Sequence, residues 1–365
     1  RSFELVVGKE VIRPDIAGLM GAYGAALLAK EQYNSNLDME YYSTVLKQEE
    51  LNNLDIKVSH IRCKGCENKC QLTINKFGNG KKFISGNRCE KGSGETTEKT
   101  DLPNIYKYKY ERLFGYEPLP ESEAKRGTIG IPRVLNMYED FPFWFTFLTK
   151  LGFRVIISEN STRKTYEKGI ESMPSESVCY PAKLAHGHIM SLIEQGIDTI
   201  FYPCIPYSRK EFEDSDNHYN CPIVISYSEV IKNNVEDLKT RNINYLNPFL
   251  PIDDIKNLAK KVYELDCFKQ YKFTKKELNI AAKAAEEEYQ KYRDDLAKKG
   301  EEVLEYIEKN DLRGIVLSGR PYHVDPEVNH GLDTLITMRI KIFSILCRFL
   351  MCFFNVTILV ISSCG

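Results

Sequence analysis

Residues 128–158, TIGIPRVLNMYEDFPFWFTFLTKLGFRVIIS, decide the fold class of this chain. The run TIGIPRVL is apolar and of strand length, and FRVIIS is a second such run. Between them, YEDFPFWFTFLTKLG has the apolar spacing of an amphipathic helix that Gly152 closes. A strand, a helix and a second strand in this order predict two parallel strands joined by a crossover helix.

The same alternation continues toward the C-terminus. The segment YPAKLAHGHIMSLIEQG, residues 180–196, is predicted to be a helix with Pro181 in its first turn and a glycine at its end. DTIFYP (198–203) is predicted to be a third strand and CPIVIS (221–226) a fourth. The fold class is therefore α/β, with flavodoxin-like or Rossmann-like parallel sheet units, and residues 128–250 are expected to form a first α/β domain.

A charged helical insert is expected at 253–310. Thr274 and Glu277 fit a capping box, so a helix should begin there, and Gly300 should divide it in two. The string RGIVLSGRPYH then repeats the opening of the first α/β unit, a strand followed by a loop with Gly, Arg and Pro. Residues 311–335 are therefore predicted to start a second, similar α/β domain.

Composition argues against two classes of protein. The chain carries 50 Lys and Arg against 51 Asp and Glu, so nothing marks it as a nucleic-acid-binding protein. Its first residues, RSFELVVGKE, lack the apolar h-region of a signal peptide. Eleven cysteines in a chain with 42% apolar residues favour metal-binding thiolates in a reducing compartment over a disulfide framework. We therefore expect a cytoplasmic protein.

Residues 60–92 form a candidate four-cysteine metal module. Within it, QLTINKF and KKFIS flank Gly78–Gly80, a strong hairpin signal that would return the fourth thiol to the first three. Four thiolates suit zinc or a 4Fe–4S cluster. The hairpin between the ligands favours a zinc ribbon, whereas the three-cysteine opening favours iron–sulfur, so the residues leave the metal open. The four expected ligands are Cys63, Cys66, Cys70 and Cys89.

Two further cysteines are expected at the edge of the sheet where ligands bind. Cys179 stands at the start of a predicted helix, whose dipole favours a thiolate, and Cys204 directly follows the strand DTIFYP. They could share a cluster or form a redox pair, or each could be a small buried apolar residue. Along the same helix we expect His186 to pack, and Lys183 and His188 to be solvated.

The string GRPYHVDPEVNHG, residues 319–331, gathers polar groups in a loop after a strand, where binding or reacting groups are common. Arg320 and His323 are the candidate cofactor contacts, with Arg320 meeting an anion such as a CoA ester. The competing interpretation is a solvated surface loop.

The N-terminal third is less regular. Residues 1–33 are predicted to hold two short strands and a helix rich in Gly and Ala, and 34–59 to be a polar linker. In the polar stretch 92–127, Tyr106, Tyr108 and Tyr110 alternate with other residues, which predicts an exposed strand.

The C-terminal end, 336–365, does not continue the α/β pattern. Residues 340–361 are apolar enough to cross a bilayer, but Arg348 and Asn355 lie inside them. We favour a frameshifted or misassembled gene end over a membrane anchor, and expect no membrane partner unless 340–361 is a real anchor.

Taken together, the motifs resemble the large proteins related to activators of 2-hydroxyacyl-CoA dehydratases. The resemblance covers roughly residues 1–333, and the strings occur in the family's order. The chain does not begin with Met, which suggests a piece of something longer. The strings that carry the resemblance are MGAYGAALLA (20–29), RCKGCENKC (62–70), SGNRCEKG (85–92), ESVCYPAKLAHGHI (176–189) and GRPYHVDPEVNHG (319–331).

The resemblance implies roles for several parts of the chain. Residues 1–33 would close an actin-like ATPase domain whose phosphate-gripping loops lie further upstream, so this chain alone is not expected to hydrolyse ATP. The α/β part is similar to the dehydratase subunits, whose paired domains hold a 4Fe–4S cluster through cysteines. By that likeness Cys179 and Cys204 become candidate ligands, with a third expected from the second α/β domain.

The function implied is an iron–sulfur electron-transfer component in the cytoplasm of an anaerobe. Its partner would be an acyl-CoA dehydratase-type protein or another redox protein, and a homodimer is compatible with the sequence. Two alternatives stay open. One is a zinc-ribbon binding module on a non-catalytic α/β scaffold, and the other is an enzyme that acts on an acyl-CoA at the sheet edge.

Overall fold

In a computed structural model of the protein, the structure describes residues 8, 10, 17–35, 47–52, 55–64, 70–78, 80–86, 102–210, 213–214, 216–333 and 356–361. The chain divides into two compact units, Arg1–Ile56 with Phe77–Gly80, and Lys57–Lys76 with Lys81–Gly365. The first unit contains η1 (Ala17–Leu19), α2 (Met20–Ser35) and α3 (Gln48–Asn52). The helix rich in Gly and Ala is thus confirmed, and the strands predicted before it lie almost entirely outside the described residues.

A three-stranded sheet precedes the α/β part in the sequence. Its strands are β1 (Ile56–Arg62), β2 (Gln71–Phe77) and β3 (Lys82–Ser85), in that order across the sheet. Strands β2 and β3 are antiparallel, with Thr73 opposite Ser85. Between them Gly80 has a φ of 82°, a left-handed conformation that glycine adopts without strain. The predicted turn between two antiparallel strands is therefore confirmed, whereas the four-cysteine arrangement around it stays a prediction.

The α/β part is built on a parallel four-stranded sheet. Its strands are β4 (Thr128–Ile131), β5 (Arg154–Ile157), β6 (Thr199–Phe201) and β7 (Asn244–Leu246). They lie in the order β5-β4-β6-β7, and each strand is parallel to its neighbours. The mixed α/β class and the first three predicted strands are confirmed.

The fourth predicted strand was wrong. The segment CPIVIS opens α9 (Pro222–Asn234), and β7 supplies the fourth strand instead. A Pro at the first helical position has its φ preset for a helix and loses no hydrogen bond there. The apolar run after Pro222 packs as a helix, with Tyr227 and Ile231 buried four residues apart.

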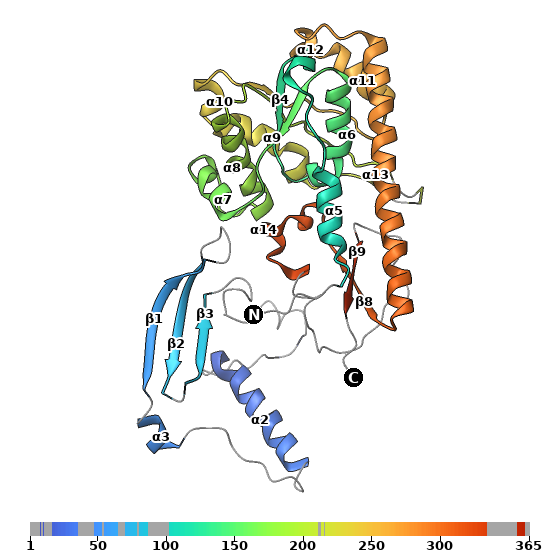
Figure 1. The fold of residues 1–365 in the computed structure, drawn as a ribbon. Helices are drawn as coiled ribbons and strands as arrows, with labels where there is room; N and C mark the ends of the chain where they lie inside the picture. Colours follow the sequence, from blue (N-terminus) through green and yellow to red (C-terminus); the bar gives the residue numbers. More distant parts are fainter. Residues whose placement is uncertain are drawn as a thin grey trace. The chain divides into compact units, whose positions relative to one another are not determined.

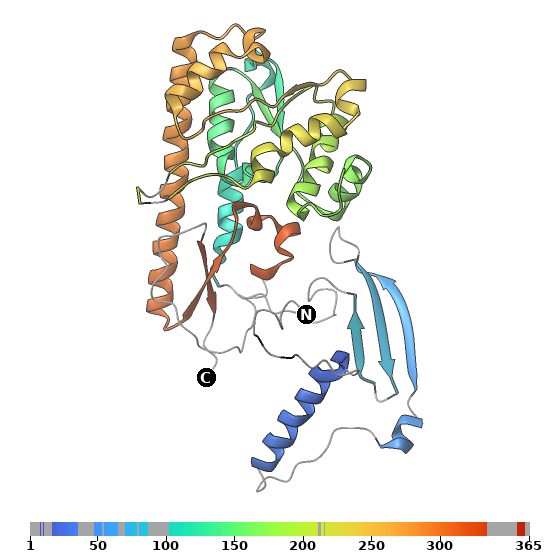
Figure 2. The same ribbon diagram turned by 180° about the vertical axis from the view of Figure 1, so that it is seen from behind.

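Helices cover both faces of the parallel sheet (Figures 1 and 2). On one face lie α6 (Met137–Lys150) and the long helix α13 (Lys275–Lys309). On the other lie α7 (Arg163–Gly169), η3 (Ile170–Ser172), α8 (Tyr180–Glu194) and α9. The remaining elements of this part are η2 (Glu121–Glu123), α10 (Asp237–Thr240), α11 (Ile255–Glu264) and α12 (Asp266–Lys269).

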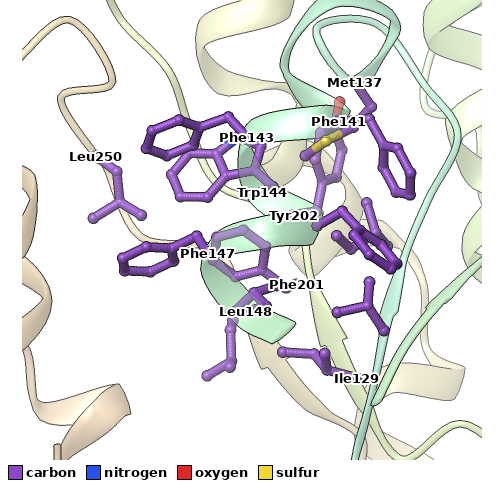
Figure 3. Close-up of a cluster of buried hydrophobic side chains, with 14 of the residues drawn as sticks. Ile129, Met137, Phe141, Phe143, Trp144, Phe147, Leu148, Phe201, Tyr202 and Leu250 are labelled. Carbon is purple, nitrogen blue, oxygen red and sulfur yellow. The ribbon is translucent and has the colours of Figure 1, made fainter. Parts of the chain in front are cut away.

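The main core lies between α6 and the sheet. Trp144, the chain's single tryptophan, is fully buried. It packs edge-to-face against Phe143, Phe147 and, from β6, Phe201 (Figure 3). Such aromatic pairs add about 0.5–1.5 kcal/mol each beyond the area they bury. This contact fixes α6 on the face of the sheet toward which Phe201 points.

The tyrosines at 106–110 belong to a helix, so the exposed strand predicted there was wrong. They lie in α5 (Ile105–Phe114), which Asn104 caps by accepting a hydrogen bond from the backbone N–H of Lys107. Tyr106 and Leu113 are buried seven residues apart, the spacing of one helical face. The alternation of tyrosine and lysine has a period of two, and it was read as a strand although the buried positions follow the helical period.

Helix α13 runs without interruption for 35 residues, so Gly300 does not divide it. The capping box of Thr274 and Glu277 at its start is confirmed. After it come β8 (Arg313–Ser318), η4 (Pro321–Val324) and α14 (Pro326–Asn329). Strand β8 pairs antiparallel with β9 (Val356–Ile361), which comes from the apolar C-terminal stretch.

Candidate functional site

The carboxyl edge of the parallel sheet carries Cys204. This residue prolongs β6: its N–H donates to the carbonyl of Pro248 at 2.9 Å, and its own carbonyl accepts from the N–H of Leu250 at 3.0 Å. The Cys204 side chain is fully buried, and burial raises the pKa of its thiol to about 11. Cys204 thus lies where the sequence predicts it, at the edge where open α/β sheets bind ligands.

Tyr202 and Cys204 point to the same face of the sheet. Both N–H groups donate to the strand that continues β7, so the backbone is extended between them and alternate side chains share a face. That face belongs to α8, because Gly130, which pairs with Ile200, touches Leu192 of α8. The thiol of Cys204 therefore faces α8 and α9, away from α6.

Helices α8 and α9 both begin with a cysteine cap at this edge. Cys179 is the N-cap of α8, and its carbonyl accepts from the N–H groups of Ala182 and Lys183. Cys221 is the N-cap of α9 and is half-buried. Because helices in a parallel α/β sheet run back against the strands, both N-termini lie at the strands' carboxyl edge. Two thiols at helix starts thus join Cys204 at one edge.

Sequence reasoning missed Cys221, because its segment was taken for a strand. The signal that could have found it is a cysteine just before a proline that starts a helix, much as Cys179 stands two residues before Pro181.

The loop after β8 reaches this edge through Tyr322. Burial, followed by the charge of Cys179, raises the pKa of Tyr322, and Cys221 acts in the same direction. Arg320 is exposed at the start of η4. The ring of His323 turns back on its own loop, where Nδ1 accepts from the N–H of Arg320 at 2.9 Å. A side chain at Gly319 would collide with this ring, with a Cβ placed 2.3 Å from Nδ1.

Asp325 is the most heavily hydrogen-bonded residue of that loop. It is buried, and one carboxylate oxygen accepts from the hydroxyls of Tyr138 and Ser161. The other oxygen accepts from the N–H groups of Glu327 at 2.7 Å and Val328 at 3.3 Å. Burial raises the pKa of Asp325, whereas these donors lower it. Asp325 thus ties the loop after β8 to α6 and to the loop after β5.

A one-way chain of hydrogen bonds leads from Asp325 to His188. Ser161 gives its proton to Asp325, so it must accept from His188 Nε2, 3.0 Å away. The neutral imidazole then accepts at Nδ1 from Ser158, 2.9 Å away, and Ser158 accepts from the N–H of Arg133 at 2.8 Å. The geometry fixes His188 as the tautomer with its proton on Nε2.

The expectation that His188 is solvated was wrong, since His188 is fully buried. His186 is also fully buried, as expected. The two histidines do face different sides of α8, but both sides are covered. His188 meets Ser158 and Ser161 after β5, and His186 lies beside Gly169 of α7. Gly187 allows this approach, because a Cβ there would lie 1.6 Å from the carbonyl oxygen of Thr165. Lys183 does stay near the surface, where its ammonium donates to the carbonyl of Glu176 at 2.6 Å.

Neutral His188 should make stability depend on pH. Burial, and then the charges of Arg133 and Lys168, lower its pKa from 6.5 to about 3. The unfolded chain binds this proton below pH 6.5 and the folded chain does not. The contribution of neutral His188 to the free energy of unfolding is therefore complete above that pH. It is lost as the pH falls toward 3, by up to about 1.4 kcal/mol per pH unit.

Urea unfolding of the wild type and of His188→Gln across this range checks the prediction. The difference in unfolding free energy should shrink as the pH falls, because the variant lacks the titrating group. Asp140, whose pKa burial raises to about 6, acts in the opposite direction in both proteins and cancels in the difference. Parallel pH profiles would contradict a buried neutral His188.

Comparison with known families identifies the part of the chain that contains this edge. A family model described as the CoA enzyme activase uncharacterised domain matches residues 128–345. The chain belongs to this CoA enzyme activase family. The match confirms the resemblance inferred from the motifs and relates the chain to activators of CoA-dependent enzymes. No curated protein and no solved structure matches the chain.

In this activase-family chain, two of the four cysteines predicted as ligands lie at one end of the hairpin sheet. Cys63 follows β1 and Cys70 precedes β2, and the N–H of Cys63 donates to the carbonyl of Cys70 at 2.8 Å. Gly86, which follows β3, lies at the same end, since a Cβ there would be 2.4 Å from the carbonyl oxygen of Gln71. Cys66 and Cys89 lie outside the described residues.

Among the residues that the structure describes, no group of three or more His, Cys, Asp or Glu side chains is placed to hold a metal ion. No helix among these residues is long and apolar enough to cross a membrane. Most of the apolar stretch 340–361 lies outside them, apart from β9.

Proposed function

We propose that this activase-family chain is an electron-transfer component that works with an ATP-dependent activator and its CoA-dependent dehydratase-type partner. It would hold a 4Fe–4S centre in the hairpin module and contribute thiolates to a second centre at the sheet edge. A cluster of this type supplies one-electron transfer at low potential. The chain's own residues hold the centres, exclude water from them and present them to the partner in the cytoplasm.

The observation that carries the proposal is that Cys63, Cys70 and the last residue of β3 lie at the same end of the hairpin sheet. Cys63 and Cys70 are joined by a backbone hydrogen bond of 2.8 Å. The chain leaves β3 at that same end, and Gly86 stands three residues before Cys89. Cys66 lies between the two joined cysteines in sequence, and both it and Cys89 are separated from this end of the sheet by only a few residues. This supports a single centre with four thiolate ligands.

The sheet edge offers a different set of groups. Cys179 and Cys204 supply two thiols there, and the hydroxyl of Tyr202 is buried without a hydrogen-bond partner among the described residues. Thiols beside an unpaired donor suit a sulfur-rich anionic group. Since the described residues hold no complete metal-binding group, the remaining ligands would come from elsewhere, as the family resemblance implies for the second α/β domain.

The loop residues Arg320 and His323 have distinct parts in this proposal. Arg320 is exposed beside Tyr322 and can meet the phosphates of a CoA ester. His323 holds the loop shape that places it, by accepting from the N–H of Arg320. Arg320→Ala should then weaken binding of a CoA ester, measured by calorimetry.

Anaerobic purification of the full chain, with iron, sulfide and zinc analysis and EPR after reduction, tests the proposal. Cys70→Ser should remove the iron of the hairpin centre, and Cys204→Ser the iron of the edge centre. Each loss should approach half of the iron in the wild type. The control is Cys267→Ser, an exposed cysteine on α12, which should change nothing.

One result would favour the second candidate, a zinc-ribbon module that docks a partner. The hairpin between the cysteine pairs is the feature that supports it. A colourless protein with stoichiometric zinc, lost in Cys70→Ser and retained in Cys204→Ser, would establish that reading and end the electron-transfer proposal.

A further inference from the structure

Strand β1 has a definite register against β2 in the hairpin sheet. At one end of the pair, the N–H of Cys63 donates to the carbonyl of Cys70 at 2.8 Å. At the other end, the N–H of Gly78 donates to the carbonyl of Asp55 at 2.9 Å. Both bonds fit a single antiparallel register without a bulge between them. The three neighbouring strands β1, β2 and β3 can therefore be aligned residue by residue.

Three lysines form a row across the sheet in this register. Lys57 of β1 lies opposite Lys76 of β2, and Lys76 lies opposite Lys82 of β3. Opposite residues of an antiparallel sheet share a face, with their Cβ atoms about 4.5–5.5 Å apart. All three side chains are exposed and belong to the same compact unit. One face of the sheet thus presents a row of three ammonium groups.

This lysine row opposes the folding of the sheet, because like charges directly opposite each other in neighbouring strands repel. Lysines on edge strands have an ordinary explanation, since charges there keep sheets from pairing with one another. Strands β1 and β3 are the edges and β2 is the centre. The explanation therefore leaves out Lys76, which places a third positive charge between the other two. Local features that work against the fold are expected at functional sites.

The whole hairpin sheet is basic. Its described residues between 55 and 86 carry six Lys and Arg side chains against one acidic side chain, Asp55. The full chain is nearly neutral, with 50 Lys and Arg against 51 Asp and Glu. Asp55 precedes Lys57 by two residues on the same face, so it offsets only part of the charge of the row. Positive charge concentrated in this way attracts a negatively charged partner.

The neighbours of the lysine row favour a protein as that partner. Ile74 and Ile84 form the next opposite pair on the same face, and both are half-buried. Apolar side chains beside exposed charges are typical of protein–protein interfaces. Single-stranded nucleic acid instead binds where aromatic rings for its bases lie beside the cations. The exposed ring of Phe83 lies on the other face of the sheet, since Phe83 follows Lys82 in the same strand.

We propose that the face of the hairpin sheet with Lys57, Lys76 and Lys82 docks an acidic surface of a partner protein. Carboxylates of the partner lie against the lysine row and relieve its repulsion, while Ile74 and Ile84 contact apolar side chains between them. The docking depends on salt, because exposed charges are screened beyond about 8 Å at physiological ionic strength. The inference goes beyond the proposed function and is independent of the metal that the cysteine module binds.

Binding of a fluorescently labelled poly-L-glutamate peptide to the full chain, followed by anisotropy at low salt, tests the proposal. Replacing the three lysines with glutamine should weaken binding about tenfold, since each exposed charge contributes little alone. Replacing them with arginine, which keeps the charge, should preserve binding. The variants compared are Lys57→Gln/Lys76→Gln/Lys82→Gln and Lys57→Arg/Lys76→Arg/Lys82→Arg.

The matched control removes the same charge from exposed lysines of α13, which lie along a helix instead of across a sheet. It should bind the peptide like the wild type. Thermal unfolding followed by circular dichroism accompanies each measurement. The glutamine variant of the row should unfold at the same temperature or higher, because it loses a repulsion, so weaker binding cannot come from misfolding. The control variant is Lys276→Gln/Lys283→Gln/Lys291→Gln.

Loss of binding in the glutamine variant of the row alone, with the control unchanged, supports the proposal. Equal losses in the two glutamine variants would mean that net charge and not the row binds the peptide, and would overturn it. So would a wild-type chain that does not bind the peptide at low salt. A thymidine oligonucleotide that binds the row more tightly than the peptide would assign this face to nucleic acid and overturn the docking of a protein.

Discussion

Replacing Arg209 with alanine is expected to lower the free energy of unfolding by about 3–5 kcal/mol, because it leaves a buried carboxylate without its cation. The guanidinium donates to Asp140 at 3.1 Å and to Glu286 at 3.1 Å. It also lies 3.8 Å from the ring centre of Tyr289 and 4.8 Å from that of Phe143. Arg209 thereby fixes the segment after Cys204 between α6 and α13.

The loss should depend on pH. Burial raises the pKa of Asp140 to about 6 even with Arg209 in place, and the arginine opposes that rise. Without Arg209 the carboxyl should stay protonated to higher pH, so the variant should lose less stability at pH 5 than at pH 8. Chemical denaturation followed by circular dichroism measures both values. The control is Arg241→Ala, which removes an exposed pair with Asp237 and should cost at most about 0.5 kcal/mol.

Asp325→Ala is expected to have the second large effect, about 3–5 kcal/mol. The variant removes a helix cap and also leaves the buried hydroxyls of Tyr138 and Ser161 without their acceptor. The loop after β8 should then detach from α6. Faster amide hydrogen exchange across 319–333, with the exchange of α6 unchanged, would report this detachment.

The control for Asp325 is an aspartate with only the capping role. Asp254 caps α11 by accepting from the N–H groups of Lys256 and Asn257, and it has no buried hydroxyl partner among the contacts recorded for it. Asp254→Ala should cost about 1 kcal/mol. An equal loss in the two variants would contradict the role assigned to the hydroxyls.

Local patterns were enough to predict most of the sheet and its helices. Strands β4, β5 and β6 are short apolar runs bounded by Gly127, Gly152 and Gly196, each with a positive φ that ends the preceding element. The segment CPIVIS failed the same reasoning, since a six-residue apolar run fits a buried strand and a buried helix equally well. Only the tertiary position of α9 decides between them.

The candidate site was predictable in part. Cys179 and Cys204 could be placed at the sheet edge because each adjoins the end of a predicted element. Asp325 and Tyr138 are 187 residues apart, and no periodicity in the sequence links them. His188 was misjudged for a similar reason, since its partners Ser158 and Ser161 lie in the segment after β5 and reach it only in the folded chain. Contacts of this kind arise from topology.

Helix α13 connects two separate hydrophobic clusters. Its first half, with Leu278, Ala285 and Tyr292, belongs to the main core, whereas Val303 packs with Ile105 in a smaller cluster. Gly300 lies between these halves, and glycine is the residue at which a helix unwinds at the lowest cost apart from proline. Helix α13 therefore spans both clusters across its weakest interior residue. The segment that follows it also touches both, since Ile315 and Leu317 pack against the main core and Leu312 against the smaller cluster.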